Sequence, residues 1–200
     1  MEHIFKNKNR ETTLVLFHGT GGDEHDLIPL GEMIDSEANI LSLRGTVNEN
    51  GLQRFFKRIK PGDFDEDDLK KRTNDLNDML KSLCSRYGLS MDAMVLMGYS
   101  NGANLISSFL SLYGKKVKGA LLLHPMTPYK NTKFPNLSDF PVFISAGKND
   151  PIVSQEDTLT LQSLLEKSGA KLEIYWHNSG HQLTNTAIAT ARDYYTHHIK

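Results

Sequence analysis

A serine lies at the centre of the pentapeptide Gly98-Tyr99-Ser100-Asn101-Gly102. An apolar run, residues 93–97, precedes it and a helical pattern, residues 103–113, follows it, so the context predicts a strand, a sharp turn and a helix. Such a nucleophile elbow holds a hydroxyl group away from the backbone. It needs glycines because the helix packs close to its strand. The alternative interpretation is a glycine-rich turn with an incidental serine.

Two residues further along the chain could activate Ser100. Asp150 lies shortly after the apolar run 142–146, and His181 lies shortly after the run 172–176. A serine hydroxyl is a weak nucleophile until a base takes its proton, and histidine titrates near neutrality. In this hypothesis His181 is the base, while Asp150 holds its imidazole in one tautomer and stabilises the imidazolium. The chain order serine, acid, histidine is that of α/β-hydrolases.

A glycine-rich loop, His18–Gly22, follows the first apolar run of the chain. The tetrahedral intermediate of acyl transfer carries an oxyanion, which needs N–H donors already in place. We expect these donors to be the backbone N–H groups of Thr20 and of Asn101, the residue after the serine. A phosphate cradle is the alternative, but the loop lacks the Gly-Lys-Ser/Thr of a P-loop and the spacing of a dinucleotide fingerprint.

Other histidines and aspartates compete for the same roles. His18 is expected to brace the glycine-rich loop and His177 to continue a strand end, while His124 also ends a predicted strand. Asp139 precedes a strand and Asp157 lies within a helical pattern, so both are poorly placed for the acid. No spacing of histidine, cysteine, aspartate and glutamate resembles a metal site, and the sequence indicates no cofactor.

The long segment 44–62 begins at a strand end and carries two adjacent phenylalanines, Phe55 and Phe56. They could wall an acyl pocket or pin the segment to the core, and we favour the wall. The segment 125–140 is short and broken by prolines, so no helical cap is expected over the site. An open pocket suits small esters, or a bulky leaving group outside it. The residues expected to line the substrate pocket are His18, Gly19, Arg54, Phe55, Phe56, Tyr99, Pro125, Met126 and Ile152.

Short apolar runs alternate with longer helical patterns along the chain. Continuous apolar strands separated by helices are typical of a parallel sheet covered on both faces. The predicted fold class is α/β: a mostly parallel, doubly wound sheet with helices on both faces and no cap, in a single domain of residues 1–200. In such sheets, sites form beyond the carboxyl ends of the strands, where the polar features above lie. The predicted strands are 13–17, 40–43, 93–97, 117–123, 142–146 and 172–176, and the predicted helices are 26–34, 66–87, 103–113, 154–168 and 183–197.

The composition of the chain limits the classes of molecule that the protein could bind. A net charge of -1 over 200 residues gives no electrostatic case for nucleic acid or for an anionic membrane. The single cysteine, Cys84, excludes an internal disulfide. No apolar stretch approaches the ~18 residues of a membrane span, and the first residues lack a signal-peptide pattern, so a cytoplasmic location is expected. The expected partner is a small-molecule ester.

Four motifs resemble those of the small, capless carboxylesterase/phospholipase family of α/β-hydrolases, which includes the acyl-protein thioesterases. The resemblance covers nearly the whole chain. It implies the α/β-hydrolase fold, carboxylesterase activity and a triad made by the serine, aspartate and histidine described above, and it is compatible with a homodimer. The motifs are His18–Asp23, Gly98–Asn104, Gly147–Pro151 and Gly180-His181.

Other segments are similar to members of that family that some bacteria encode with methylhydroquinone-resistance dioxygenases, which implies a role in quinone or hydroquinone detoxification. The thioesterase branch has a different elbow and a tryptophan-bearing loop, whereas this chain has Asn101 and Phe55-Phe56. We therefore expect a serine carboxylesterase that cleaves small or aryl esters through an acyl-enzyme. The alternatives are a thioesterase or lysophospholipase-type acyl hydrolase, a hydrolase of C–C bonds, and a catalytically silent protein that binds a small ligand. The similar segments are Arg44-Gly45, Glu49–Gly51, Arg54–Phe56 and His124–Met126.

Overall fold

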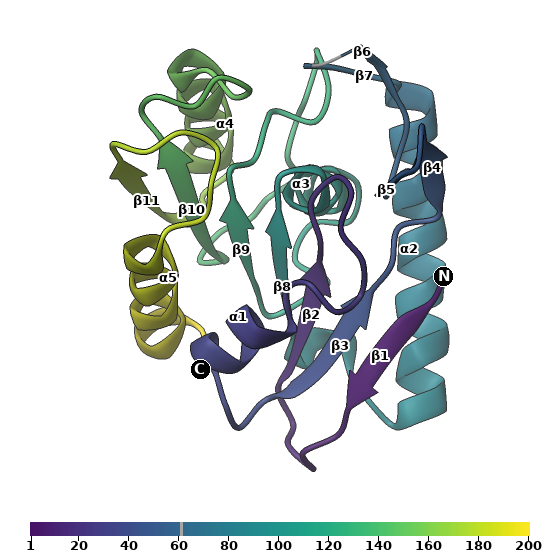
Figure 1. The fold of residues 1–200 in the computed structure, drawn as a ribbon. Coiled ribbons are helices and arrows are strands. Elements are labelled where there is room, and N and C mark those ends of the chain that lie inside the picture. Colours follow the sequence, from purple (N-terminus) through teal and green to yellow (C-terminus); the bar gives the residue numbers. More distant parts are fainter. Residues whose placement is uncertain (61) are drawn as a thin grey trace.

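A seven-stranded sheet runs through the middle of the computed structural model, which describes residues 1–60 and 62–200 (Figure 1). The strand order is β1-β3-β2-β8-β9-β10-β11, and all neighbouring pairs are parallel except β1 and β3. The mostly parallel sheet predicted from the sequence is confirmed, with one antiparallel edge strand, β1, that the pattern does not predict. The strands are His3–Lys6 (β1), Thr13–Phe17 (β2), Asn39–Leu43 (β3), Met94–Tyr99 (β8), Gly119–Leu123 (β9), Pro141–Gly147 (β10) and Lys171–His177 (β11).

Helices cover both faces of the sheet, as the doubly wound prediction requires. One face carries α1 (Ile28–Ile34) and α5 (Asn185–His198). The other carries α2 (Glu66–Tyr87), α3 (Asn101–Tyr113) and α4 (Gln155–Lys167). A single 3₁₀ turn, Met91–Ala93, leads into β8. The segment between β9 and β10, where a cap domain could be inserted, contains no helix, so the predicted absence of a cap holds.

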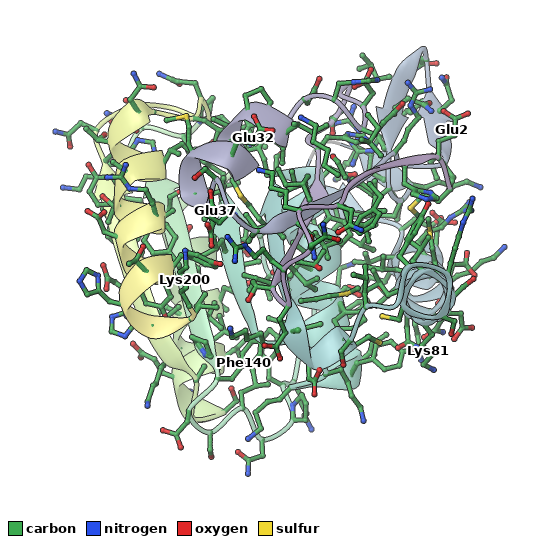
Figure 2. The ribbon with its side chains drawn as sticks, turned by 90° about the horizontal axis from the view of Figure 1, so that it is seen from below. Glu2, Glu32, Glu37, Lys81, Phe140 and Lys200 are labelled. Carbon is green, nitrogen blue, oxygen red and sulfur yellow. The ribbon has the colours of Figure 1, made fainter. Side chains whose placement is uncertain are left out.

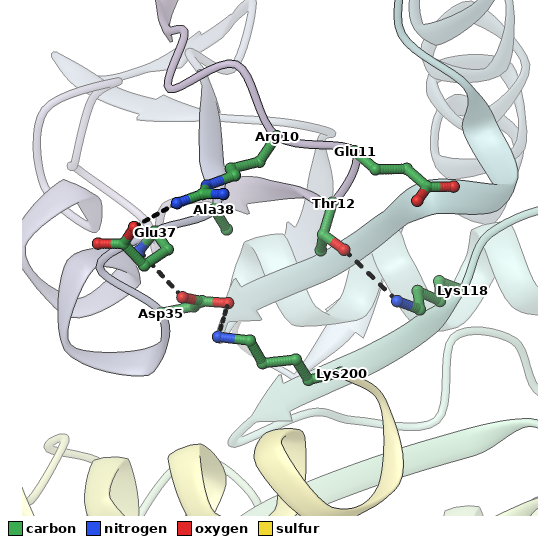
Figure 3. A pocket seen from close by; sticks show the side chains of 8 residues that line it. All are labelled: Arg10, Glu11, Thr12, Asp35, Glu37, Ala38, Lys118 and Lys200. Carbon is green, nitrogen blue, oxygen red and sulfur yellow. Dashed lines mark hydrogen bonds and ion pairs between the residues drawn. The ribbon is translucent and has the colours of Figure 1, made fainter.

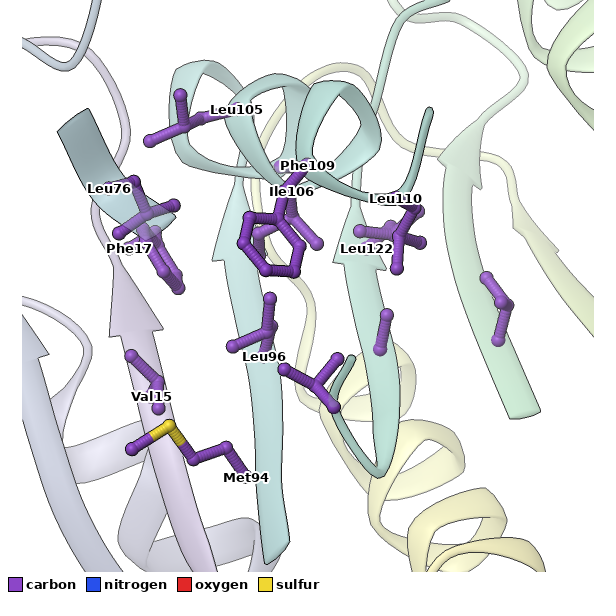
Figure 4. Packing of buried hydrophobic residues seen from close by; sticks show 14 of the residues in the cluster. Val15, Phe17, Leu76, Met94, Leu96, Leu105, Ile106, Phe109, Leu110 and Leu122 are labelled. Atoms are coloured by element: carbon purple, nitrogen blue, oxygen red, sulfur yellow. The ribbon is translucent and has the colours of Figure 1, made fainter. Parts of the chain in front are cut away.

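Alternate residues of each strand face opposite layers of helices. In β2, Val15 and Phe17 join the cluster under α3, whereas Leu14 and Leu16 join the cluster under α1 and α5. Figure 4 shows the first cluster, in which Phe109 and its neighbours on α3 lie over the strands. Because both faces are buried, the strands read as continuous apolar runs rather than as alternating ones. Figure 2 shows the side chains from below; the labelled Glu37 and Lys81 are both exposed.

The long helix α2 has clear signals at both ends. The Asp65 carboxylate accepts a hydrogen bond from the Asp68 N–H at 3.0 Å, which caps the first turn. Gly88 ends the helix in the left-handed conformation, with φ 66°. Glu66, Asp67 and Asp68 lie in the first turn, where the helix dipole favours negative side chains. Within the described part of the chain, none of the helices has the length and apolar character needed to cross a membrane.

The segment that follows β3 contains two small hairpins rather than a simple loop. β4 (Val47–Glu49) pairs with β5 (Leu52–Arg54), and β6 (Arg58–Lys60) pairs with β7 (Asp63–Phe64). The turn of the first hairpin is Asn50-Gly51, with φ values of 54° and 86°. Asn-Gly is the commonest two-residue hairpin turn because both positions need positive φ. This signal was present in the sequence, but the hairpins were not predicted from it.

Candidate active site

Ser100 lies at the carboxyl end of β8, between that strand and α3. Its φ of 50° is unusual for a residue other than glycine, and its N–H donates to the Leu123 carbonyl at 2.8 Å. A Cβ at Gly102 would lie 2.6 Å from the carbonyl carbon of Phe17, and one at Gly98 would lie 2.7 Å from the Ala103 nitrogen. Only glycine therefore lets α3 start so close to the ends of β2 and β8. The turn is strained in the way that a nucleophile elbow requires.

Three side chains from separate loops form one hydrogen-bonded chain. Ser100 Oγ lies 2.8 Å from His181 Nε2, and His181 Nδ1 lies 2.7 Å from Asp150 Oδ2. Asp150 follows β10 and His181 follows β11, so the parallel strands deliver all three groups to the same edge of the sheet. With Nδ1 bonded to a carboxylate, His181 carries its hydrogen there. Its Nε2 is then free to accept the serine proton.

The Asp150 carboxylate is fully used as an acceptor. Oδ1 accepts the N–H groups of Ile152 and Val153 at 2.8 and 3.0 Å, and Oδ2 lies 2.7 and 2.8 Å from ring nitrogens of His181 and His124. Burial by itself would raise the pKa of Asp150, but these hydrogen bonds outweigh it and hold the pKa below its ordinary value. The group is therefore a stable anion at neutral pH.

His124, which follows β9, is the main group at the site to which the sequence analysis assigned no role. Its Nδ1 lies 2.8 Å from Asp150 Oδ2, and its Nε2 lies 3.3 Å from Nε2 of His177. Burial, the largest effect, lowers the pKa of His124 to about 4. Metal-ligand atoms of His124, Asp150 and His181 lie within 4.8 Å of one another. The N–O separations of 2.7 and 2.8 Å are those of direct hydrogen bonds, shorter than the roughly 3.3 Å between two ligands on one tetrahedral zinc.

The two expected oxyanion donors border the same cleft as Ser100. Neither the Thr20 N–H nor the Asn101 N–H donates a hydrogen bond within residues 1–60 and 62–200, so both remain available. The sheet order reverses between β2 and β8, and the loops after these strands carry the two donors. This is the crevice in which doubly wound sheets bind ligands. The Asn101 side chain contributes differently, because its Oδ1 accepts the Phe55 N–H at 2.7 Å and ties segment 44–62 to the elbow.

A cleft of about 330 Å³ opens over Ser100. Of the residues predicted for the substrate pocket, Arg54, Tyr99, Met126 and Ile152 line it. Five other lining residues were not predicted. Leu52, Arg58 and Gly62 are among them, and the sequence around them has no periodicity that would separate inward from outward positions. The missed lining residues are Leu52, Arg58, Gly62, Phe64 and Asn104.

The prediction that Phe55 and Phe56 wall the pocket is wrong. Both are fully buried, and the ring centroid of Phe55 lies 5.5 Å from that of Phe17 and 4.6 Å from that of His18. Burying these apolar rings in the core is more favourable than exposing them in an open cleft. The two rings therefore anchor this part of the chain to the core.

His18, Gly19 and Pro125 were also predicted for the pocket wall, and this prediction is wrong because none of the three lines the cleft. His18 braces the glycine-rich loop instead. Its Nε2 accepts the Gly45 N–H at 2.9 Å, and its Nδ1 lies 2.6 Å from the Gly19 carbonyl oxygen. Burial lowers the pKa of His18, which keeps the ring neutral in this role.

Arg54 supports the loop that carries Thr20. It is 3% exposed; its Nη1 donates to Thr20 Oγ1 at 2.6 Å and its Nε to the Phe56 carbonyl at 3.2 Å. Glu49 lies between Arg54 and Arg58, 3.8 and 2.8 Å from their Nε atoms. Burial, followed by the charge of Arg58, lowers the pKa of Arg54 below its ordinary value. The arginine nevertheless stays charged at neutral pH and fixes the loop through directed hydrogen bonds.

A larger cavity, of about 430 Å³, lies at the opposite, amino ends of the strands (Figure 3). Four of its charged residues form two ion pairs: Arg10 lies 2.8 Å from Glu37, and Lys200 lies 3.0 Å from Asp35. It contains no serine, cysteine or histidine among its lining residues. The carboxyl-end cleft, with an activated hydroxyl group, is therefore the better candidate for an active site.

Comparison with known proteins agrees with this geometry. The family model of the dienelactone hydrolase family matches residues 58–197. The chain is 44% identical over 195 residues to “Putative hydrolase MhqD” of Bacillus subtilis (strain 168), covering 98% of each protein.

Solved structures that are similar to this one include two bacterial carboxylesterases. The Bacillus cereus carboxylesterase has a TM-score of 0.96 and 45% identity, over 98% of this chain and 93% of the other. The Mesorhizobium loti carboxylesterase has a TM-score of 0.89 and 30% identity, over 94% and 90%. These similarities confirm the resemblance drawn from the motifs. The chain belongs to the dienelactone hydrolase family and is a hydrolase with the α/β-hydrolase fold.

Proposed function

We propose that this hydrolase is a serine carboxylesterase that cleaves small or aryl carboxylic esters through an acyl-enzyme. The observation that carries the proposal is the continuous hydrogen-bonded chain from Ser100 through His181 to Asp150 at the floor of an open cleft. A protein that only binds a ligand has no need of a base aimed at a strained serine. This argues against the silent binding protein as the alternative.

In the proposed first half-reaction, Ser100 Oγ attacks the ester carbonyl carbon while His181 Nε2 takes the serine proton. The carbonyl oxygen becomes an oxyanion, which accepts the N–H groups of Thr20 and Asn101. Asp150 remains ionised and stabilises the imidazolium. Collapse of the intermediate expels the alcohol oxygen, which receives the proton from His181 and leaves an acyl group on Ser100. In the second half-reaction, water attacks the acyl carbon while His181 Nε2 takes a proton from it. The bond to Ser100 Oγ then breaks, Oγ receives that proton from His181, and the carboxylic acid is released.

The lining of the cleft favours a substrate with a small acyl or aryl group. Its apolar lining comes from Leu52, Phe64, Met126 and Ile152, of which Leu52 and Ile152 are 45% and 53% exposed. Apolar side chains at an open rim favour a compact apolar group over a long chain enclosed in a tunnel. Aryl esters of hydroquinones belong among the substrates to test, because of the family likeness of Arg44-Gly45, Glu49–Gly51, Arg54–Phe56 and His124–Met126. A role in quinone or hydroquinone detoxification is part of the same proposal.

Replacing Ser100 by alanine tests the nucleophile. We expect turnover of p-nitrophenyl butyrate and of a hydroquinone ester to fall roughly 10⁴-fold or more, with unchanged circular dichroism. Labelling by a fluorophosphonate probe should be lost at the same time. Ser85→Ala is a suitable control because Ser85 is an exposed serine of α2, far along the chain from the elbow. Substantial turnover by Ser100→Ala would refute the proposal.

The same triad could also hydrolyse a thioester, so the test must compare oxygen esters with thioesters. Matched butyrate esters and thioesters with the same leaving group size separate the two activities. We expect the oxygen ester to have the higher kcat/KM. A higher kcat/KM for the thioester would assign the protein to the acyl-hydrolase alternative with the nucleophile unchanged.

A further inference from the structure

We propose that His124 is a positioning residue of the esterase reaction, whose neutral imidazole donates a hydrogen bond to the catalytic carboxylate. It thereby limits how strongly that carboxylate holds a protonated His181. The proposal rests on the function proposed above. It extends the group of three side chains to five: Ser100, His181, Asp150, His124 and His177.

The geometry makes His124 and His181 equivalent partners of one oxygen. Their Nδ1 atoms lie 2.8 and 2.7 Å from Asp150 Oδ2, and their ring centroids lie 5.0 Å apart with an interplanar angle of 67°. The side chains of His124 and Asp150 are 0% and 1% exposed, so water does not compete for these bonds. His124 reaches the carboxylate from a backbone φ of 54°, in the left-handed region. Such a conformation in a buried residue often marks a functional position.

The hydrogen positions follow from the partners of each nitrogen. Asp150 is an acceptor only, so His124 carries its hydrogen on Nδ1 and its Nε2 is an acceptor. The contact of 3.3 Å with His177 Nε2 then requires the hydrogen of His177 to be on Nε2. This leaves His177 Nδ1 unprotonated, and that atom is buried without a hydrogen-bond partner. A bare ring nitrogen costs less there than an unpaired N–H donor would, so the assignment is consistent along the whole chain.

The surroundings keep His124 neutral. The titratable groups that face its ring are Asp150, His177, His181 and Tyr99, whose ring centroid lies 5.9 Å away. Burial is the largest effect on the pKa of His124 and lowers it to about 4, against the opposing effect of Asp150. Asp150 therefore carries the negative charge of this network, and the His124 ring beside it is neutral. His124 is a permanent donor over the pH range in which an esterase works.

A second donor on Oδ2 spreads the carboxylate charge and weakens its hold on a protonated His181. Without the His124 donor, the acid limb of the kcat/KM profile should move upward by about half to one pH unit. A residue that only fills space would lower the rate equally at every pH and leave the limb in place.

Two variants separate these outcomes. His124→Asn keeps an N–H donor near the Nδ1 position and tolerates positive φ, whereas His124→Gly tolerates positive φ but has no donor. We expect the acid limb of kcat/KM for p-nitrophenyl butyrate to shift upward in His124→Gly and to stay at the wild-type position in His124→Asn. KM should change little in either. A limb that stays in place in the glycine variant, or that moves equally in both, overturns the proposal.

A second measurement needs no variant and applies if His124→Gly fails to fold. In ¹⁵N-histidine spectra of the wild-type protein between pH 5 and 8, His124 should be protonated on Nδ1 and unprotonated on Nε2. The opposite tautomer, or a positively charged ring, overturns the proposal. The spectra do not require turnover, so they test the hydrogen positions separately from the esterase proposal. Failure of the esterase proposal would instead appear as turnover by Ser100→Ala.

Discussion

Acidification from pH 7 to 5 should destabilise the folded protein by about 2 kcal/mol through His124 alone. The pKa of this residue is about 4 in the folded protein, because burial disfavours the charged ring, against an ordinary value of 6.5. Between these two values the unfolded chain binds a proton that the folded protein does not. Unfolding therefore takes up protons, and the free energy of unfolding falls as the pH is lowered.

The magnitude follows from the separation of the two pKa values. The full difference between 6.5 and about 4 is equivalent to about 3 kcal/mol, of which about 2 kcal/mol is lost between pH 7 and 5. Most carboxylates contribute little in this window, because the unfolded chain ionises them near pH 4. Burial raises the pKa of Asp157, so this residue acts in the opposite direction. Burial also lowers the pKa values of His18 and His177, so they act in the same direction.

Urea unfolding at pH 7 and at pH 5, followed by the fluorescence of Trp176, measures the effect, since Trp176 is the single tryptophan of the chain. His124→Asn is the matched control, because it lacks the titrating ring while His18 and His177 remain. The wild type should lose about 2 kcal/mol more than the variant between the two pH values. Equal losses in the two proteins, at unchanged m-values, would refute the reasoning.

Two further predictions concern the elbow. Gly102→Ala should lower the free energy of unfolding by about 3 kcal/mol in urea titrations, because its methyl group would meet the backbone of Phe17 and His18 rather than a movable side chain; a loss below 1 kcal/mol would contradict this. Tyr99→Phe removes a 2.8 Å hydrogen bond from the Tyr99 hydroxyl to the His181 carbonyl. It should cost about 1 kcal/mol of stability and lower kcat less than about tenfold, and ester turnover at saturation checks the second figure.

The sheet could be predicted from the sequence because burial on both faces leaves an unmistakable pattern. Runs such as Thr13–Phe17 are apolar throughout, and the predicted long helix at 66–87 agrees with α2 at both ends. The edge strand β1, with the sequence His-Ile-Phe-Lys, lacks this pattern because its residues are only partly buried. Its place is set by pairing with β3, a tertiary contact that a local pattern does not record.

The orientation of Phe55 and Phe56 could not be predicted, for a different reason. Both lie in an irregular stretch between β5 and β6, where neither a period of 2 nor one of 3.6 separates inside from outside. What decides their orientation is the Phe55 N–H, held by the Asn101 side chain at 2.7 Å. His124 was missed for a similar reason, because its positive φ turns the ring from the strand direction toward Asp150.

The meeting of serine, acid and base depends as much on glycines as on the reactive residues. Gly147 ends β10, and a Cβ there would lie 2.6 Å from the Ser179 carbonyl oxygen, so only glycine lets the loops of Asp150 and His181 touch. Gly102 likewise lets α3 contact the backbone at the end of β2. A polar residue after a strand is common in any doubly wound sheet. A glycine packed against the backbone of another loop is a more specific signal. Such a contact forms only when both loops are in place. The glycine in each motif is therefore the part of the pattern that distinguishes Asp150 from Asp157, which lies on a helix without such a contact.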